Sequence, residues 1–132
     1  MGSEMCIRDR PDTFADLRGQ YETTLLENPS GEDITAAARQ GDPLAAAVMK
    51  DFGQWLGQGL SMVADVLDPE LIVIGGGVSQ DADLYLDTAR ECMARQIVGA
   101  GHRPLARVAT AELGSAAGMI GVADLARQER RG

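Results

Sequence analysis

The residues best suited to chemistry are three consecutive glycines, residues 75–77, that follow a short apolar run. The run, LIVI at residues 71–74, is entirely apolar and too short for a helix, which is typical of a buried parallel strand. Glycines at the carboxyl end of such a strand allow a sharp turn and let the backbone approach a ligand with no Cβ between them. The free N–H groups at the start of the next helix suit an anionic or polar group. The pattern predicts a turn compatible with a phosphate or a nucleotide, with a tight turn that binds nothing as the open alternative.

This turn matches neither of two common nucleotide-binding motifs. Gln80 stands where a dinucleotide fingerprint needs its third glycine, and no Lys-Ser or Lys-Thr pair follows as in a P-loop. A second small-residue turn follows the second predicted strand, where Gly114 and Gly118 flank Ser115 and two alanines. Because the carboxyl ends of parallel strands meet at one edge of a sheet, we expect the two glycine turns to lie side by side there.

The other side chains that could do chemistry are interpreted as structural. His102 is the only histidine and is predicted to lie in a loop, rather than to act as a base or ligand. Asp65, Asp68 and Glu70 cluster near a predicted helix end with no partner spaced to perturb them, so we expect solvated carboxylates. Cys92 is expected to be inert in the middle of a helix. With no Ser-His-Asp set, nucleophile elbow or paired acid and base in the sequence, no catalytic residue is predicted.

The elements that position the glycine turns follow from hydrophobic periodicity. Helices are predicted over residues 12–27, 32–40, 43–67, about 81–98 and 115–128, and strands over residues 71–74 and 106–113. The order α-α-α-β-α-β-α predicts an α/β fold whose C-terminal half is one β-α-β-α unit with a right-handed crossover.

Small and apolar side chains on these helices predict the packing. Gly53, Gly57 and Ser61 form a small-residue stripe on the helix over residues 43–67. We interpret the stripe as a surface for close helix packing, with a groove that faces a ligand as the alternative. Trp55 is expected in the core. The last helix is expected to turn its apolar side chains inward, namely Met119, Ile120, Val122 and Leu125.

Composition and charge exclude several classes of function. The 132 residues amount to about one domain, with 45% hydrophobic and 24% charged residues, as in an ordinary globular protein. A net charge of −8 opposes binding to a nucleic-acid backbone. No apolar run approaches the about 20 residues of a membrane helix, and no signal peptide is recognisable. Cys6 and Cys92 lie far apart without a CxxC motif, so neither a metal site within this chain nor a needed disulfide is predicted. We therefore expect a cytoplasmic protein that binds neither nucleic acid nor membrane.

Residues 1–10, MGSEMCIRDR, show neither helical nor strand periodicity. The last six read like the translation of a transposase-end sequencing adaptor. We interpret the segment as a disordered artefact and exclude it from the fold. On this interpretation the natural protein continues upstream of Pro11, and residues 11–132 are a fragment. The alternative is a short disordered leader.

The segment LDPELIVIGGGVS at residues 67–79 resembles the adenosine segment of ROK-family sugar kinases and repressors. The Gly-His-Arg-Pro loop and LGSAAGMIGVA at residues 113–123 match the C-terminal part of the same family. The resemblance covers about residues 30–128 and is greatest to glucokinases of the actinobacterial type. It implies the C-terminal lobe of a two-lobed, actin/hexokinase-like (ribonuclease H-like) kinase, in which ATP and a sugar meet in the cleft.

The resemblance also implies roles for particular residues. The nucleotide would be lined, near its ribose and α-phosphate, by Gly75, Gly76, Gly77 and Val78. Ser79 would either cap the next helix or touch the nucleotide. A hinge helix between the lobes would begin with Gly114, Ser115 and Gly118. ATP with Mg²⁺ and a hexose are the implied ligands, and a homodimer is the implied assembly because the family often dimerises.

Several parts that the family uses are not in this sequence. They are the Asp-x-Gly-Gly-Thr phosphate loop, the catalytic Asp, the Glu-x-Gly-His sugar motif and the Cys-rich zinc loop. The resemblance therefore implies an ATP-dependent glucokinase or hexose kinase as the parent, and a chain that is inactive alone and does not bind the structural zinc. Two alternatives stay open: the C-terminal lobe of a ROK transcriptional repressor that senses a sugar, and an independent nucleotide-binding module. Neither the sugar nor the choice of ATP or polyphosphate as donor follows from the sequence.

Overall fold

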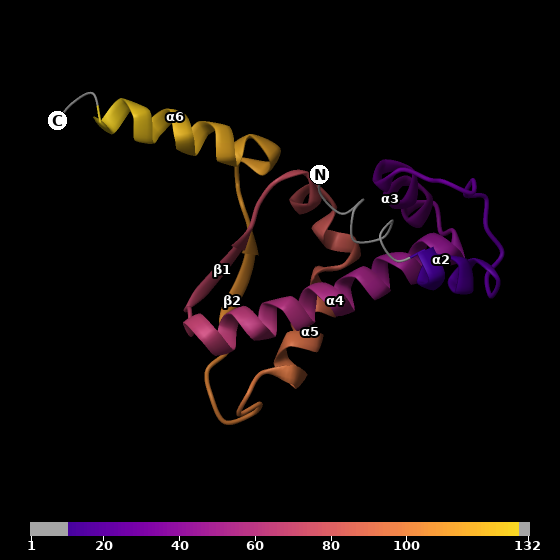
Figure 1. Cartoon of the computed structure of the whole chain (residues 1–132), viewed down its shortest axis with the longest axis horizontal. Coiled ribbons are helices and arrows are strands. Elements are labelled where there is room, and N and C mark those ends of the chain that lie inside the picture. Colours follow the sequence, from indigo (N-terminus) through magenta and orange to yellow (C-terminus); the bar gives the residue numbers. More distant parts are fainter. Residues whose placement is uncertain (1–10, 130–132) are drawn as a thin grey trace.

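The longest element of the fold is a 25-residue helix, α4 (Pro43–Leu67), which runs beside the rest of the chain (Figure 1). The structure is a computed structural model and describes residues 11–129. Asp42 caps the start of α4 by accepting a hydrogen bond from the N–H of Ala45, and Pro43 occupies the first turn, where its missing N–H costs nothing. The helix ends at Leu67, and the Asp68 that follows it has a left-handed backbone conformation with φ 45°. The predicted bounds of this helix are confirmed.

Two short helices, α2 (Pro11–Arg18) and α3 (Gly31–Arg39), pack near the start of α4. The predicted helix over residues 12–27 is wrong beyond Arg18. Residues 19–30 are irregular because their polar groups bind elsewhere: the N–H of Thr24 donates to the Asp42 carboxylate at 2.8 Å, and the Thr23 hydroxyl donates to it at 3.0 Å. These bonds give the chain an alternative to helical hydrogen bonding.

The sheet consists of two parallel strands, β1 (Leu71–Ile74) and β2 (Arg107–Thr110). The predicted second strand, residues 106–113, is shorter than expected at both ends. The strands are connected through a 3₁₀ helix, η1 (Gly77–Leu84), and then α5 (Leu86–Gln96). A single helix over residues 81–98 was the prediction, and the chain breaks it at Tyr85, whose φ of −138° is not helical.

The core lies where α3, α4, α5 and the inner face of the sheet meet, and its members include Ile34, Leu44, Val48, Met49, Leu60, Tyr85, Ala89, Met93 and Val108. Gly53 and Gly57 are buried against α5, and a Cβ on Gly57 would lie only 2.5 Å from the Cβ of Cys92. The interpretation of the small-residue stripe as a helix-packing surface is confirmed.

Among residues 11–129, elements cover the sheet on one face only. Ile72 and Ile74 pack against the core, whereas Leu71 and Val73 are 42% and 53% exposed. The expectation of a strand buried on both faces is therefore wrong for the outer face. Trp55 was expected in the core and is also exposed, at 47%, because α5 packs against the side of α4 that carries Gly53 and Gly57, and a position two residues from each lies on the opposite side of the helix.

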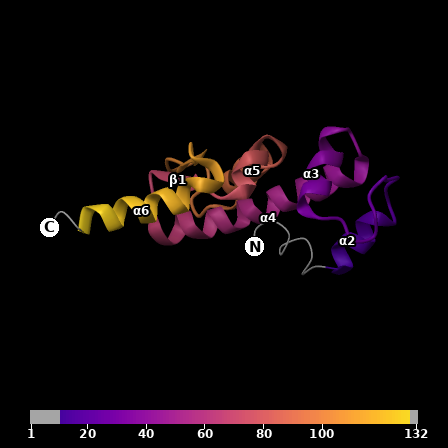
Figure 2. The same cartoon turned by 90° about the horizontal axis from the view of Figure 1, so that it is seen from above.

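The last helix, α6 (Ala117–Glu129), follows a short 3₁₀ turn, η2 (Gly114–Ala116), and projects away from the sheet (Figures 1 and 2). Its apolar side chains do not point inward as predicted; Met119, Ile120, Val122 and Leu125 are all exposed. The described part of the chain offers no element against which this face could pack. Within residues 11–129, none of the helices combines the length and apolar character needed to cross a membrane.

Candidate functional site

The two glycine turns lie side by side at one edge of the sheet, as predicted. The parallel strands are in register to their ends, and the N–H of Ala111 donates to the carbonyl of Ile74 at 2.8 Å just beyond them. A methyl group on Gly75 would lie 3.8 Å from the Cβ of Ala111. The Nε2 of Gln80 lies 3.7 Å from the place that a Cβ on Gly114 would take. The segments after the two strands therefore touch each other.

Gly76 and Gly77 present bare, exposed backbone at this edge. Gly76 has φ 80° and ψ −172°, a conformation that is essentially restricted to glycine. A Cβ at either position would meet no other described residue within 4 Å. Packing within residues 11–129 therefore does not explain Gly77, and a ligand can approach the backbone there directly.

Ser79 and Val78 lie inside η1, with their polar groups engaged within the chain. The Ser79 hydroxyl is buried and donates to the carbonyl of Gly76 at 2.7 Å. This bond closes the turn, so Ser79 does not cap a helix in the way that the resemblance suggested. Val78 packs its side chain against the core, and its carbonyl accepts a hydrogen bond from the Tyr85 hydroxyl at 2.7 Å.

Two side chains that the sequence analysis did not single out hold this segment, Tyr85 and Arg39. Arg39, near the end of α3, forms ion pairs with Asp83 at 2.5 Å and with Asp81 at 2.8 Å. The Arg39 guanidinium holds the pKa of Asp83 below its ordinary value of 3.8, while burial, and then Asp81, raise the pKa of Tyr85 above its ordinary value. Arg39 is 42 and 44 positions from its partners, so spacing along the sequence does not reveal the contact.

The second turn carries the three residues assigned to a hinge. Gly114 has φ 53°, and its N–H donates to the carbonyl of Ala111 at 3.2 Å. Ser115 and Gly118 are exposed, and a Cβ on Gly118 would meet no described residue within 4 Å. The start of α6 therefore consists of small residues that are exposed or partly exposed, and η2 connects it to the body of the fold.

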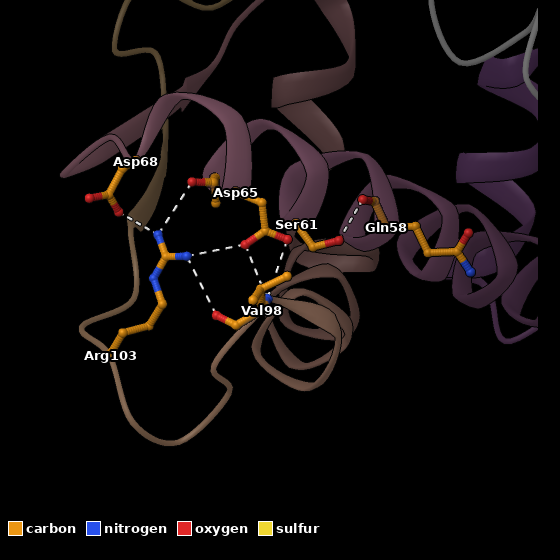
Figure 3. Close-up of polar contacts among 7 residues, drawn as sticks. Gln58, Ser61, Asp65, Asp68, Val98 and Arg103 are labelled. Carbon is orange, nitrogen blue, oxygen red and sulfur yellow. Dashed lines mark hydrogen bonds and ion pairs between the residues drawn. The ribbon is translucent and has the colours of Figure 1, made fainter.

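In the acidic cluster at the end of α4, Asp68 and Glu70 are exposed, as expected, but Asp65 and Asp68 have a partner that was not expected (Figure 3). Asp65 pairs with Arg103 at 3.1 Å and also accepts a hydrogen bond from the N–H of Val98 at 3.1 Å. Arg103 pairs with Asp68 as well and donates to the carbonyl of Ala64. These contacts tie the end of α4, just before β1, to the loop before β2, at the end of the sheet opposite the glycine turns. Arg103 lies 38 positions from Asp65, which is why the sequence did not show the pair.

The remaining chemical candidates form no site. His102 is exposed in a turn, as predicted. Cys92 is buried, and its thiol donates a weak hydrogen bond to the carbonyl of Gln54 at 3.2 Å. Among residues 11–129, no three His, Cys, Asp or Glu side chains gather in a way that would hold a metal ion.

The fold that these elements build matches solved sugar-kinase structures of the actin/hexokinase-like type. A ROK family glucokinase from Streptomyces griseus, solved in complex with glucose and AMPPNP, superposes with a TM-score of 0.74 at 38% identity. The match covers 96% of this chain and 40% of that one. A ROK family transcriptional regulator, a homologue of the E. coli MLC protein, gives a TM-score of 0.65 at 31% identity, over 81% of this chain and 27% of the regulator.

The sequence profile of the ROK family matches residues 4–129, and the chain belongs to that family. A glucokinase from Streptomyces coelicolor is 44% identical over 98 residues, which is 74% of this chain. The chain spans 31% of the length of that relative. The resemblance noted from the segments at residues 67–79 and 113–123 is confirmed at the level of the family and of its fold.

Proposed function

We propose that this chain is the nucleotide-binding, C-terminal part of an ATP-dependent glucokinase or related hexose kinase. In the reaction, the γ-phosphoryl group of ATP passes to the 6-hydroxyl of the sugar. The observation that carries the proposal is the pair of glycine turns at one sheet edge, where exposed backbone at Gly77 faces open space. The similarity to a glucokinase that was solved with glucose and AMPPNP supports it.

In this proposal, residues 75–79 line the nucleotide near its ribose and α-phosphate. Gly75, Gly76 and Gly77 bring the backbone close because no Cβ intervenes, and Val78 follows them. Ser79 acts indirectly, because its hydroxyl closes the turn on the carbonyl of Gly76. Phosphoryl transfer depends mainly on positioning and on stabilisation of charge. The contribution of this chain is thus to orient one end of ATP.

ATP is taken to enter as its Mg²⁺ complex, as phosphoryl-transfer enzymes generally require. The described residues form no group of three metal-binding side chains, so we propose no resident Zn²⁺ site among them; Mg²⁺ would enter bound to the phosphates of ATP. We expect no sugar phosphorylation by this chain alone, because the family's phosphate loop and catalytic Asp are not in its sequence.

We also propose that Gly114, Ser115 and Gly118 form the start of a hinge helix between two lobes. The apolar face of α6 supports this role, because Met119 and Val122 are 73% and 68% exposed. An exposed apolar surface of this kind usually marks a contact with another protein element. The second lobe of the parent kinase would cover it, and residues 11–132 would be the fragment of one lobe. We further propose that the parent kinase forms a homodimer.

A sugar-sensing ROK repressor is the second candidate, favoured by the match to the ROK transcriptional regulator. The coding sequence upstream of Pro11 distinguishes the two. Codons for Asp-x-Gly-Gly-Thr and Glu-x-Gly-His would support the kinase, and codons for a basic helix-turn-helix would support the repressor.

The kinase is tested by expressing the protein with its upstream coding sequence and measuring glucose-dependent release of ADP. We expect activity in the extended protein and none in the 132-residue chain. In the extended protein, Gly77→Ala should raise the KM for ATP about tenfold, because the added methyl group occupies the space of the ligand. Gly59→Ala is the matched control, since its Cβ also meets no described residue but lies on α4 away from the turns. Glucose-dependent ADP release by the pure 132-residue chain would contradict the proposal.

A further inference from the structure

We propose that Tyr85 and Arg39 are positioning residues of the nucleotide site, an inference that rests on the function proposed for residues 75–79. Neither side chain belongs to the glycine turns. Tyr85 holds η1 from the core, and Arg39 holds it from the surface. Together they set the direction in which the backbone leaves Gly77.

The segment that begins at Gly77 cannot set its own shape. It is a 3₁₀ run, whose hydrogen bonds are poorer than those of an α-helix, and it is interrupted at Asp81, where φ is −104° and ψ is 22°. Gly76 and Gly77 have no side chains that could pack against other elements. The conformation presented to a ligand therefore depends on contacts that reach η1 from other elements.

Tyr85 supplies a fixed contact from the core. It is only 1% exposed, and its ring packs edge-on against Phe52 with 4.9 Å between the ring centroids. Because the ring is held in this way, the hydroxyl is a donor at a fixed position, 2.7 Å from the carbonyl of Val78. Val78 follows Gly77 directly, so this bond orients the peptide group next to the bare backbone.

Arg39 supplies the contact from the surface. Its two terminal nitrogens bind both oxygens of Asp83, at 2.5 Å and 3.0 Å, and one of them also binds Asp81 at 2.8 Å. This forked arrangement fixes geometry as well as charge. The side chains of Arg39 and Asp83 are 44% and 58% exposed, and ion pairs this exposed add little to the stability of a fold. Arg39 is thus expected to act on the shape of η1 more than on folding.

Loss of either contact should lower the affinity for the nucleotide, because a smaller fraction of the molecules would hold the turn in its binding-competent conformation. When a binding-competent conformation is only partly populated, the apparent dissociation constant rises in proportion. Removing one hydrogen bond or ion pair from η1 should therefore weaken the binding of an adenine nucleotide about 2- to 10-fold.

The test measures the dissociation constant of AMPPNP for the 132-residue chain by isothermal titration calorimetry. The variants are Tyr85→Phe, which keeps the packed ring and removes the hydroxyl, and Arg39→Gln, which removes the forked ion pairs. We expect each to weaken binding about 2- to 10-fold. The backbone amide shifts of residues 76–79 should also change in the free variants, which reports the altered turn directly.

Two control variants separate positioning from general stability and charge. Ile97→Val removes a buried methyl group at the far end of α5 and should destabilise the fold without changing affinity. Arg95→Gln makes the same charge change as Arg39→Gln at an exposed position of α5 and should leave affinity unchanged. Equal loss of affinity in Ile97→Val and Tyr85→Phe would overturn the positioning role.

The same measurements distinguish failure of the positioning roles of Tyr85 and Arg39 from failure of the nucleotide site proposed at residues 75–79. If Gly77→Ala weakens AMPPNP binding while Tyr85→Phe and Arg39→Gln do not, the positioning roles are wrong and the nucleotide site stands. If the unchanged chain does not bind AMPPNP, or if Gly77→Ala leaves binding intact, the proposed site itself is wrong.

Discussion

Replacing Gly57 with alanine is expected to force α4 away from α5. The new Cβ would lie 2.5 Å from the Cβ of Cys92 and 2.6 Å from the carbonyl oxygen of Ala89. Neither atom is the free end of a flexible side chain, so the helices themselves must move apart. Overpacking of this kind costs typically about 1–3 kcal/mol, and contacts this short place Gly57→Ala at the upper end. Alanine returns about 1 kcal/mol through its higher helix propensity. The free energy of unfolding should therefore fall by about 2 kcal/mol.

Gly59→Ala is the matched control for this change. It lies on the same helix, and its Cβ would meet no described residue within 4 Å. The control gains the helix propensity without the clash, so its free energy of unfolding should rise by about 0.5–1 kcal/mol. Urea unfolding followed by far-ultraviolet circular dichroism measures both variants. If Gly57→Ala is as stable as Gly59→Ala, the described close contact between α4 and α5 at Gly57 does not exist.

Three further predictions concern the remaining contacts. Arg103→Met leaves the partly buried carboxylate of Asp65 without its cation and should lower the free energy of unfolding by about 1–3 kcal/mol in urea; an unchanged midpoint would refute a structural role for the pair. Asp42 has a pKa lowered from 3.8 to about 2, first by the backbone N–H groups that it binds, so its stabilising effect is full above its ordinary pKa and is lost as the pH falls toward 2. Asp42→Asn should therefore flatten the loss of stability between pH about 4 and about 2 in urea titrations, and an unaltered pH profile would contradict this. Gly76→Ala should destabilise the chain by about 1–3 kcal/mol because φ is 80°, whereas Gly77→Ala should leave thermal stability unchanged; equal effects would contradict the described turn.

The elements that a local pattern specifies were predictable from the sequence. Helix α4 combines a capping Asp42, a proline at its first position and an apolar repeat, and its bounds agree with the prediction. The parallel pairing of β1 and β2 followed from an apolar run and an alternating segment separated by a helical segment, so the glycine turns were expected at one edge. The close approach at Gly57 was visible as a small-residue stripe.

The contacts that the sequence did not reveal join residues that are distant along the chain. Arg103 and Asp65 are 38 positions apart, and Arg39 and Asp83 are 44 apart, so no periodicity connects them. Periodicity also identifies an apolar face without showing what covers it. Val122 on α6 lies on such a face, and it is exposed within the described chain.

The most direct test of the proposed nucleotide site is a residue-resolved titration of the 132-residue chain with AMPPNP, followed by ¹H–¹⁵N correlation spectra. With the site at the glycine turns, the amide signals of residues 75–79 and of Gly114 should shift together along one binding curve, while those of Asp65, Asp68 and Arg103 at the opposite end of the sheet stay in place. Signals that shift only elsewhere, or no shift at saturating AMPPNP, would contradict a nucleotide site at the glycine turns.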